Sequence, residues 1–209
     1  MVKINFRAVE QRFYGRQIFG PLDCTLSGGR IVAVTGKNGS GKSTFLKLAG
    51  HLLPPSQGKI TVVSDGRELR GEELRRHLAM VTPEMRFYDR LTARENMDFL
   101  LGMRGITLDN AVYGELLGRV GLDEQAVCRS YAGDFSTGMK QRLKMAVLLA
   151  ARADIWLLDE PGANLDEAGR QMTAREVRAA ADKGVLVVLA TNEPGEEALA
   201  DERIALAGH

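Results

Sequence analysis

The sequence predicts an α/β fold with a mainly parallel sheet at its core. Short runs rich in β-branched residues alternate with segments of helical periodicity, which is the pattern of strand–helix–strand units. The section at roughly 86–135 is the exception, because it contains helical signals and no clear strand. The sequence therefore indicates a single domain over residues 1–209, with a helical lobe inserted at roughly 86–135.

A local signal indicates each element of the expected core. The β-branched run at 31–35 (IVAVT) predicts a buried strand. Residues 42–50 then predict a helix, which ends at a glycine and is soon followed by a pair of prolines. Further strands are expected at 59–63, 154–158 and 185–190.

Two more helices are indicated by the residues at their starts. In the helix expected at 92–103, Thr92 is the N-cap and Glu95, three residues later, completes a capping box. In the helix expected at 136–152, apolar residues recur at spacings of three and four, which predicts one apolar face.

Composition and charge exclude several classes of protein. The net charge is +1 and no basic run is present, so we expect no nucleic-acid partner. The two cysteines, Cys24 and Cys128, form no CxxC pair and are expected to be reduced thiols of a cytoplasmic protein. No apolar run approaches the roughly 20 residues of a membrane span, and the N-terminus lacks a signal peptide's apolar region. Any membrane part must therefore come from another chain.

A phosphate-binding motif directly follows the strand expected at 31–35. Residues 36–44 read GKNGSGKST and fit G-x-x-x-x-G-K-[ST]. The glycines allow backbone N–H groups and a helix N-terminus to face an anion, whereas a glycine-rich turn with a stray lysine is the alternative. In the first interpretation, Lys42 reaches the β- and γ-phosphates and Ser43 binds Mg²⁺. The candidate nucleotide-binding residues of this loop are Asn38, Gly39, Ser40, Gly41, Lys42, Ser43 and Thr44.

Two adjacent carboxylates, Asp159 and Glu160, end the apolar strand expected at 154–158. A buried strand that stops in two acids needs a cation nearby, and Mg²⁺ on a nucleotide supplies one. We expect Asp159 to hold Mg²⁺ and Glu160, which points elsewhere, to polarise the attacking water as a general base. On its own, the pair is equally consistent with a strand that ends in solvent.

A third motif narrows the class of protein. Residues 135–142 read FSTGMKQR and resemble the ABC signature, whose usual form is LSGGQ followed by a basic stretch. With the phosphate loop and the Asp-Glu strand in the same order, essentially the whole chain resembles the ATP-binding subunit of an ABC transporter, in the P-loop NTPase superfamily. The resemblance implies a P-loop NTPase core, an N-terminal antiparallel β part and an inserted helical lobe. It also implies an ATP hydrolase that uses Mg²⁺.

The resemblance implies that the protein works as a head-to-tail dimer. In the family, the signature binds ATP that is held by the other subunit, which is a second copy of the chain or a homologous one. The signature residues in this role would be Ser136, Thr137 and Gly138. Ser136 is otherwise an ordinary helix N-cap.

Two weaker matches add candidate residues. The segment that ends at Asp166 resembles the family's D-loop, which would place Asp166 at the subunit interface. Tyr14 resembles the aromatic residue that stacks on adenine, and Phe13 is a competing candidate. A strand aromatic in the core is the alternative for Tyr14.

Two positions depart from the family's pattern. The family usually has a histidine after the last core strand, where this chain has Asn192, which can donate a hydrogen bond to the γ-phosphate but cannot carry a proton. An ungapped comparison puts Pro83 where the Q-loop glutamine belongs, and Glu84 beside it either takes over the contact with Mg²⁺ or water or leaves that function lost. Because Glu160 remains, we expect slow hydrolysis rather than none.

The family docks its permease on the loop that here connects Glu84 to Thr92. Its aromatic residues Phe87 and Tyr88 suit a partner surface, although a connecting turn with local packing is the alternative. We therefore expect a peripheral subunit on the cytoplasmic face of the membrane that drives a separate transmembrane permease, an exporter. Two alternatives stay open: a soluble ABC ATPase outside transport, and an ATP-sensing subunit with weak hydrolysis.

Overall fold

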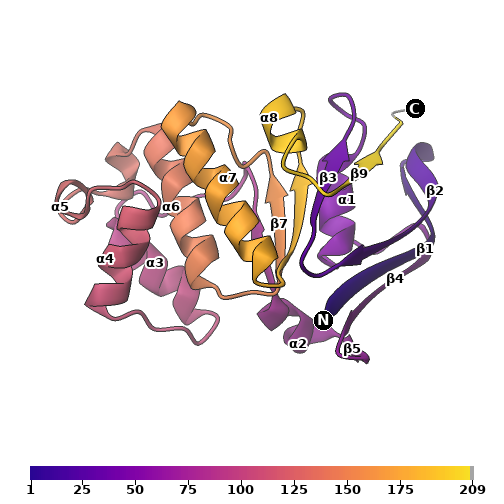
Figure 1. Ribbon diagram of the computed structural model, residues 1–209, viewed down its shortest axis with the longest axis horizontal. Helices are drawn as coiled ribbons and strands as arrows, with labels where there is room; N and C mark the ends of the chain where they lie inside the picture. The colour runs from indigo at the N-terminus through magenta and orange to yellow at the C-terminus, as the bar shows by residue number, and fades with distance from the viewer. Residues whose placement is uncertain (208–209) are drawn as a thin grey trace. The chain divides into compact units, whose positions relative to one another are not determined.

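The computed structural model describes residues 1–207, so the last two residues of the expected domain, Gly208 and His209, lie outside the described residues. The chain divides into two compact units (Figure 1). The core unit comprises Met1–Met80, Ala153–Glu160 and the described part of Val177–His209. The helical unit comprises Val81–Arg152 and Pro161–Glu176. The assignment of residues 1–209 to one domain with a lobe at 86–135 stays a prediction.

An antiparallel sheet of four strands, in the order β2-β1-β4-β5, forms one part of the core unit. Its strands are β1 (Val2–Phe13), β2 (Arg16–Ser27), β4 (Gln57–Ser64) and β5 (Arg67–Leu69). The strand expected at 59–63 is β4. The antiparallel N-terminal part of the predicted fold is therefore confirmed.

A second sheet of five strands, in the order β6-β7-β8-β3-β9, forms the other part of the core unit. Its strands are β6 (Leu78–Val81), β7 (Ile155–Asp159), β8 (Leu186–Ala190), β3 (Ile31–Thr35) and β9 (Glu202–Ala205). Strands β7, β8, β3 and β9 run parallel, which confirms the mainly parallel core. Because β8 lies between β3 and β7, the carboxyl ends of all three strands open at one edge of the sheet.

Helix α1 (Lys42–Ala49) packs against both sheets of the core unit. Its Phe45 stacks on Phe6 of β1, with ring centroids 4.8 Å apart, and lies at a tilt to Phe19 of β2. At its end, Gly50 lies so close to Leu157 of β7 that a Cβ atom on Gly50 would come within 3.0 Å of that side chain. The two short helices of this unit are α2 (Gly71–His77) and α8 (Pro194–Glu197).

The helical unit consists of short helices whose starts the sequence marks. They are α3 (Ala93–Gly102), α4 (Asn110–Arg119), α5 (Glu124–Val127), the single 3₁₀ turn η1 (Ala132–Asp134) and α6 (Thr137–Ala150). Thr92 caps α3 in a complete capping box with Glu95, and Ser136 caps α6, as predicted. Within 86–135, which the structure describes throughout, the only β-type pairing is an isolated bridge between Thr92 and Tyr131.

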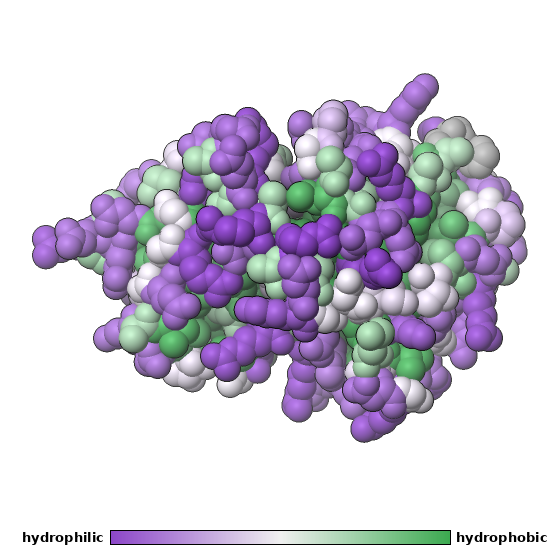
Figure 2. Space-filling view, in the orientation of Figure 1, coloured by the Kyte–Doolittle hydropathy of each residue, from purple (hydrophilic) through white to green (hydrophobic). Residues whose placement is uncertain are grey.

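Helix α7 (Glu167–Asp182) begins in the helical unit and ends in the core unit. Buried residues such as Met172, Val177 and Ala180 recur along one face, and most of the charged residues are exposed, apart from the buried Glu176. Figure 2 shows mostly hydrophilic side chains over α7. Of the helices between residues 1 and 207, none has the length and apolar character that crossing a membrane requires.

Candidate functional site

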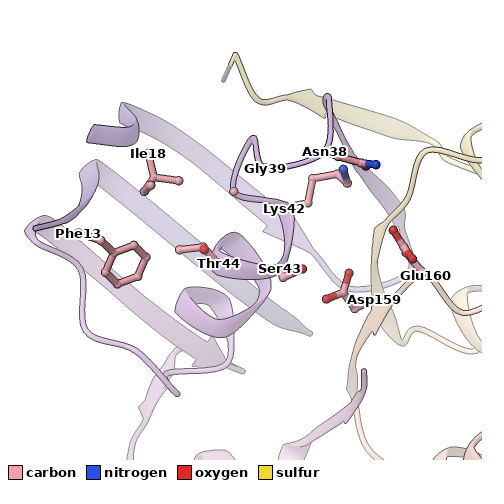
Figure 3. Close-up of a pocket in the computed structure, with 10 residues that line it drawn as sticks. Phe13, Ile18, Asn38, Gly39, Lys42, Ser43, Thr44, Asp159 and Glu160 are labelled. Atoms are coloured by element: carbon pink, nitrogen blue, oxygen red, sulfur yellow. The ribbon is translucent and has the colours of Figure 1, made fainter. Parts of the chain in front are cut away.

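A cavity of about 350 Å³ opens at the edge of the parallel sheet where β3 and β7 end. It extends from the end of β1 to the end of β7, and the loop at 36–44 lies between them (Figure 3). Its lining residues are Phe13, Ile18, Asn38, Gly39, Gly41, Lys42, Ser43, Thr44, Asp159 and Glu160. All of them belong to the core unit. The cavity thus unites most of the predicted phosphate-loop residues with both predicted carboxylates.

The loop at 36–44 has a backbone conformation that leaves amide groups available to an anion. Gly36, Gly39 and Gly41 all have positive φ angles, and a Cβ atom on Gly41 would lie 2.5 Å from the Ile18 side chain. Gly41 is the N-cap of α1 and offers no side-chain cap, so the first N–H groups of α1 have no capping oxygen. These groups, at the positive end of the helix dipole, suit a phosphate.

The side chain of Lys42 lies over its own loop. It is only 7 % exposed, and its Nζ donates to the carbonyl oxygens of Gly36 at 2.8 Å and Lys37 at 3.5 Å. An incoming phosphate would compete with these neutral acceptors and form the stronger, charge-assisted hydrogen bond.

Ser40 lies beneath the loop and does not line the cavity. Its Oγ is buried, has no hydrogen-bond partner among the described residues, and would lie 2.5 Å from a Cβ atom on Gly36. Its backbone N–H already donates to the carbonyl of Lys37, at 3.0 Å. A contact between nucleotide and Ser40 therefore needs a change at this residue.

The two carboxylates at the end of β7 have different environments. Asp159 is 5 % exposed and, with Ser43, faces the same part of the cavity, whereas Glu160 is exposed (Figure 3). Glu160 has a φ of 49°, a left-handed conformation that costs free energy at a non-glycine residue, and its N–H donates to Ala190 of β8 at 2.9 Å. The Ser43 hydroxyl and the Asp159 carboxylate are hard oxygen donors of the kind that Mg²⁺ prefers.

Asn192 contacts the phosphate loop without lining the cavity. It follows β8, and its Nδ2 donates to Oδ1 of Asn38 at 2.7 Å. The family usually has a histidine at this position. Here the side-chain amide of Asn192 is hydrogen-bonded to that of Asn38, and Asn38 does line the cavity.

Of the two aromatic candidates, Phe13 lines the cavity and Tyr14 does not. Tyr14 and Gly15 form the two-residue turn between β1 and β2, and both have positive φ angles, as a tight right-twisted hairpin requires. That turn leaves the Tyr14 side chain fully exposed, whereas Phe13 is 39 % exposed. Ile18 also lines the cavity, and nothing in the sequence distinguishes it from other strand residues.

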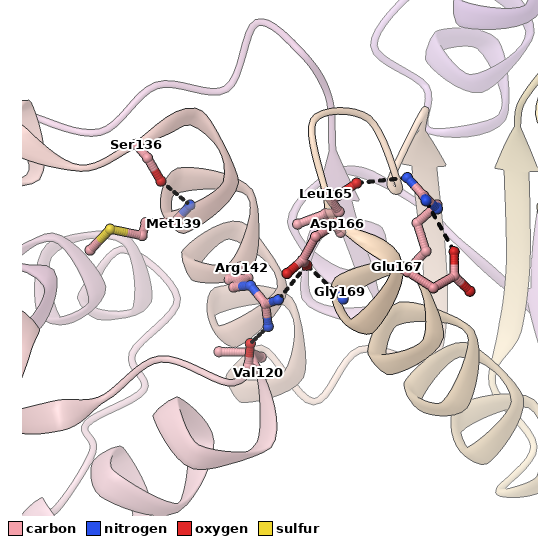
Figure 4. Close-up of polar contacts among 9 residues, drawn as sticks. Val120, Ser136, Met139, Arg142, Leu165, Asp166, Glu167 and Gly169 are labelled. Carbon is pink, nitrogen blue, oxygen red and sulfur yellow. Dashed lines mark hydrogen bonds and ion pairs between the residues drawn. The ribbon is translucent and has the colours of Figure 1, made fainter.

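The predicted signature and D-loop residues all lie in the helical unit (Figure 4). Ser136 accepts a hydrogen bond from the N–H of Met139 at 3.1 Å and so caps α6, and Thr137 is the exposed first residue of that helix. A Cβ atom on Gly138 would lie 3.2 Å from the carbonyl oxygen of Asn164, so the start of α6 and the segment before Asp166 approach closely.

Asp166 links α6 to the first turn of α7 in the helical unit. It accepts a hydrogen bond from the N–H of Gly169 at 2.9 Å, in the first turn of α7, and another from Arg142 of α6 at 2.7 Å (Figure 4). Arg142 also donates to the carbonyl of Val120 at 2.8 Å. The Gly169 amide, with help from Arg142, holds the pKa of the Asp166 carboxyl below its usual range.

The loop around Glu84 is also part of the helical unit, and Glu84 itself is exposed. Phe87 is buried, so its ring does not form part of the partner surface expected for this loop. Tyr88 is 55 % exposed and packs edge-on against Phe99 of α3, with ring centroids 5.0 Å apart. The exposed aromatic surface of this region therefore comes from Tyr88 and Phe99.

Comparison with known proteins agrees with this geometry. The model of a protein family described as "ABC transporter" matches residues 19–163. The cytochrome c biogenesis ATP-binding export protein CcmA of Agrobacterium fabrum is 35 % identical over 190 residues, which cover 85 % of this chain and 83 % of CcmA. The Escherichia coli protein YbhF, named a probable multidrug ABC transporter ATP-binding protein, is 30 % identical, and the match covers 90 % of this chain but 33 % of YbhF.

A solved structure shares the fold. The dimeric structure of MJ0796, a bacterial ABC transporter cassette, superposes with a TM-score of 0.83 and 23 % identity, over 97 % of this chain and 94 % of that one. A solved structure therefore contains the same combination of antiparallel sheet, parallel sheet and helical region as this chain.

Proposed function

Since this chain belongs to the ABC transporter family, we propose that it is the ATP-driven subunit of an exporter whose transmembrane permease is a separate chain. ATP binding and ATP hydrolysis are the activities of this family's cassette. Export as the direction of transport is supported by the name of CcmA, an ATP-binding export protein. As the subunit of such an exporter, the protein would act on the cytoplasmic face of the membrane.

The observation that carries this proposal is the cavity that brings Lys42 and Ser43 together with Asp159 and Glu160. In it, Lys42 and the amides of its loop bind the phosphates of ATP. Ser43 and Asp159 hold Mg²⁺, which when bound supplies positive charge beside the phosphate oxygens. Glu160, the exposed carboxylate at the rim, orients the attacking water and accepts its proton.

The dimer is supported by the exposed start of α6. Ser136 and Thr137 are exposed at the N-terminus of this 14-residue helix, where helix dipole and N–H groups favour an anion. In the proposed head-to-tail pair, these residues and Gly138 bind the γ-phosphate of ATP held by the other copy. Asp166, close behind them in the helical unit, lies at the interface, and a two-fold axis relates the two equivalent sites.

Asn192 supports the expectation that this chain hydrolyses ATP slowly. Its amide can donate to the γ-phosphate, but it cannot take up a proton or a charge. In the structure, this amide donates to Oδ1 of Asn38. The second candidate function, an ATP-sensing subunit with weak hydrolysis, rests on this residue and on the missing Q-loop glutamine, whose position Pro83 occupies.

We expect Phe13→Ala to weaken ATP binding by about tenfold, because stacking of a base on an aromatic ring contributes about 1–3 kcal/mol. ATP and GTP should be affected alike, since stacking does not depend on the base's hydrogen-bonding groups. Tyr14→Ala is the matched control and should bind ATP as wild type does, because its ring lies outside the cavity. Titration with a fluorescent ATP analogue measures both. A larger loss in Tyr14→Ala would return the base-stacking role to Tyr14.

The proposed permease contact can be tested from the exposed aromatic pair. We expect a photo-crosslinker attached to Tyr88→Cys to capture an integral membrane protein when the subunit is added to membranes of the cells that make it. The background variant replaces Cys24 and Cys128 by serine, so that the label has a single attachment point. Mass spectrometry of the adduct identifies the partner.

Leu52→Cys is the matched control for this experiment. Leu52 is 64 % exposed, comparable to Tyr88 at 55 %, but it belongs to the core unit and not to the Glu84–Thr92 connection. Labelling of the same membrane protein from both positions would argue against Tyr88 as the docking point. Labelling from neither position would argue against a permease partner and would favour a soluble ATPase.

A further inference from the structure

A buried lysine lies on the helix that begins at the signature. Lys144 of α6 is 7 % exposed, and lysine is seldom buried to this extent without partners. Its Nζ donates to the carbonyl oxygen of Thr82 at 2.8 Å and to that of Pro83 at 3.4 Å. All three residues belong to the helical unit, so the start of the loop that carries Glu84 is tied directly to α6.

The charges around Lys144 indicate that this tie includes Glu84. Burial lowers the pKa of Lys144, the Glu84 carboxylate acts in the opposite direction, and Arg86 adds to the lowering. Glu84 is thus close enough to interact electrostatically with the ammonium group. The family has a neutral glutamine at the position of Pro83. In this chain the next residue, Glu84, is negatively charged and interacts with the positive charge of Lys144.

A different residue holds the far end of the same loop. The fully buried Asn96 of α3 accepts a hydrogen bond from the N–H of Tyr88 at 2.8 Å and donates to the carbonyls of Tyr88 and Leu91, at 3.1 and 3.2 Å. The loop is therefore fixed to α3 at one end and to α6 at the other. Lys144 is the connection to the helix whose start bears Ser136.

We propose that Lys144 is a positioning residue for ATP hydrolysis, which ties the Thr82–Glu84 segment to the signature helix so that Glu84 and α6 move together. The inference rests on the proposed function, in which α6 binds the second copy's ATP, and on the expectation that Glu84 takes over the contact of the family's Q-loop glutamine. Lys144 itself touches no reacting group. It acts through its hydrogen bonds to the carbonyls of Thr82 and Pro83 and through its charge interaction with the carboxylate of Glu84.

Lys144→Met is the first test, because it keeps an unbranched side chain of similar length and removes only the ammonium group. We expect kcat to fall about tenfold, as the loss of a hydrogen bond from a charged donor predicts, with little change in the KM for Mg-ATP. The melting temperature should fall modestly, because the carbonyls of Thr82 and Pro83 lose a charged donor, and kcat and KM are therefore measured well below it. Lys183→Met, at an exposed lysine of the core unit, is the matched control and should leave both constants unchanged.

Amide hydrogen exchange, measured without nucleotide, tests whether Lys144 holds the Thr82–Glu84 segment against α6. The carbonyl of Thr82 also accepts the N–H of Met85, at 3.2 Å, so loosening this segment should speed exchange in a peptide that spans residues 82–92. We expect faster exchange there in Lys144→Met and not in Lys183→Met. Unchanged exchange would overturn the proposal. If the wild-type chain hydrolyses no ATP, the proposed function fails, and this measurement still decides whether Lys144 holds the loop.

A double-mutant cycle separates positioning from general structural support. If Lys144 acts through Glu84, then Glu84→Gln combined with Lys144→Met should be no slower than the slower single variant, because both changes remove the same connection. Losses in kcat that multiply, or a rise in KM without a fall in kcat, would show that Lys144 does not act through Glu84.

Discussion

Glu160→Gln is expected to lower kcat for ATP by about 10²- to 10⁴-fold, the usual contribution of a positioned general base. The amide keeps the size and shape of the side chain but cannot accept a proton from water. ATP binding should persist, because Lys42 and the loop amides are unchanged. Bound ATP should therefore accumulate, and the variant should elute from gel filtration in Mg-ATP as a dimer while the wild-type chain turns over.

The backbone conformation at Glu160 should be unchanged in Glu160→Gln, so this variant tests the side chain alone. The left-handed φ of 49° and the hydrogen bond from its N–H to Ala190 do not depend on the charge of the side chain, so the fold should be retained. Glu202→Gln, at an exposed carboxylate of β9, provides the control and should hydrolyse ATP at the wild-type rate. Wild-type turnover in Glu160→Gln would remove Glu160 from the mechanism. A stalled variant that stays monomeric would argue against the ATP-bound dimer.

Lys42→Met should lose ATP affinity by about 10- to 100-fold, since one charge-assisted hydrogen bond contributes about 1.5–3 kcal/mol. Hydrolysis should fall further, because the ammonium group also stabilises charge that develops on the transferred phosphoryl group. Both effects can be read from one pair of measurements: phosphate release, and the rise in melting temperature on adding ATP. Ligand that binds the folded state at 100 times its Kd adds about 2.7 kcal/mol of stability, and the same ATP concentration should add only about 0.4–1.4 kcal/mol in the variant.

The same loop provides a matched control for this prediction. Lys37→Met makes the identical chemical change at an exposed lysine that does not line the cavity, and it should leave both measurements unchanged. Lys42→Arg separates charge from geometry. Because the Lys42 side chain is almost fully buried and its Nζ contacts the carbonyls of Gly36 and Lys37, the longer planar guanidinium should not restore hydrolysis. Full activity in Lys42→Arg would mean that positive charge alone is sufficient.

Much of the fold could be predicted from the sequence because its signals are local. The capping box of Thr92 and Glu95 spans a single helical turn, and β3 is a short run of buried, β-branched residues. The phosphate loop is equally local, since its glycines, its lysine and the first turn of α1 are contiguous. For the same reason, the sequence was sufficient to place Asp159 at the end of a buried strand and Glu160 directly after it.

Other features depend on strand order and on contacts between distant residues. Lys42 and Asp159 share a cavity because β8 lies between β3 and β7, an order that no local pattern encodes. The choice of Phe13 over Tyr14 follows from the conformation of a two-residue turn, which reverses the direction of neighbouring side chains.

Two further contacts could not be read from the sequence. Asn192 pairs with Asn38, and Lys144 holds the carbonyls of Thr82 and Pro83, although each pair is far apart along the chain. Motifs therefore identified the groups that we propose bind and cleave ATP, since that chemistry depends on residue type and short spacing. Only the tertiary structure decided which distant side chains hold those groups in place, because these contacts form when sheets and helices pack and leave no periodic signal in the sequence.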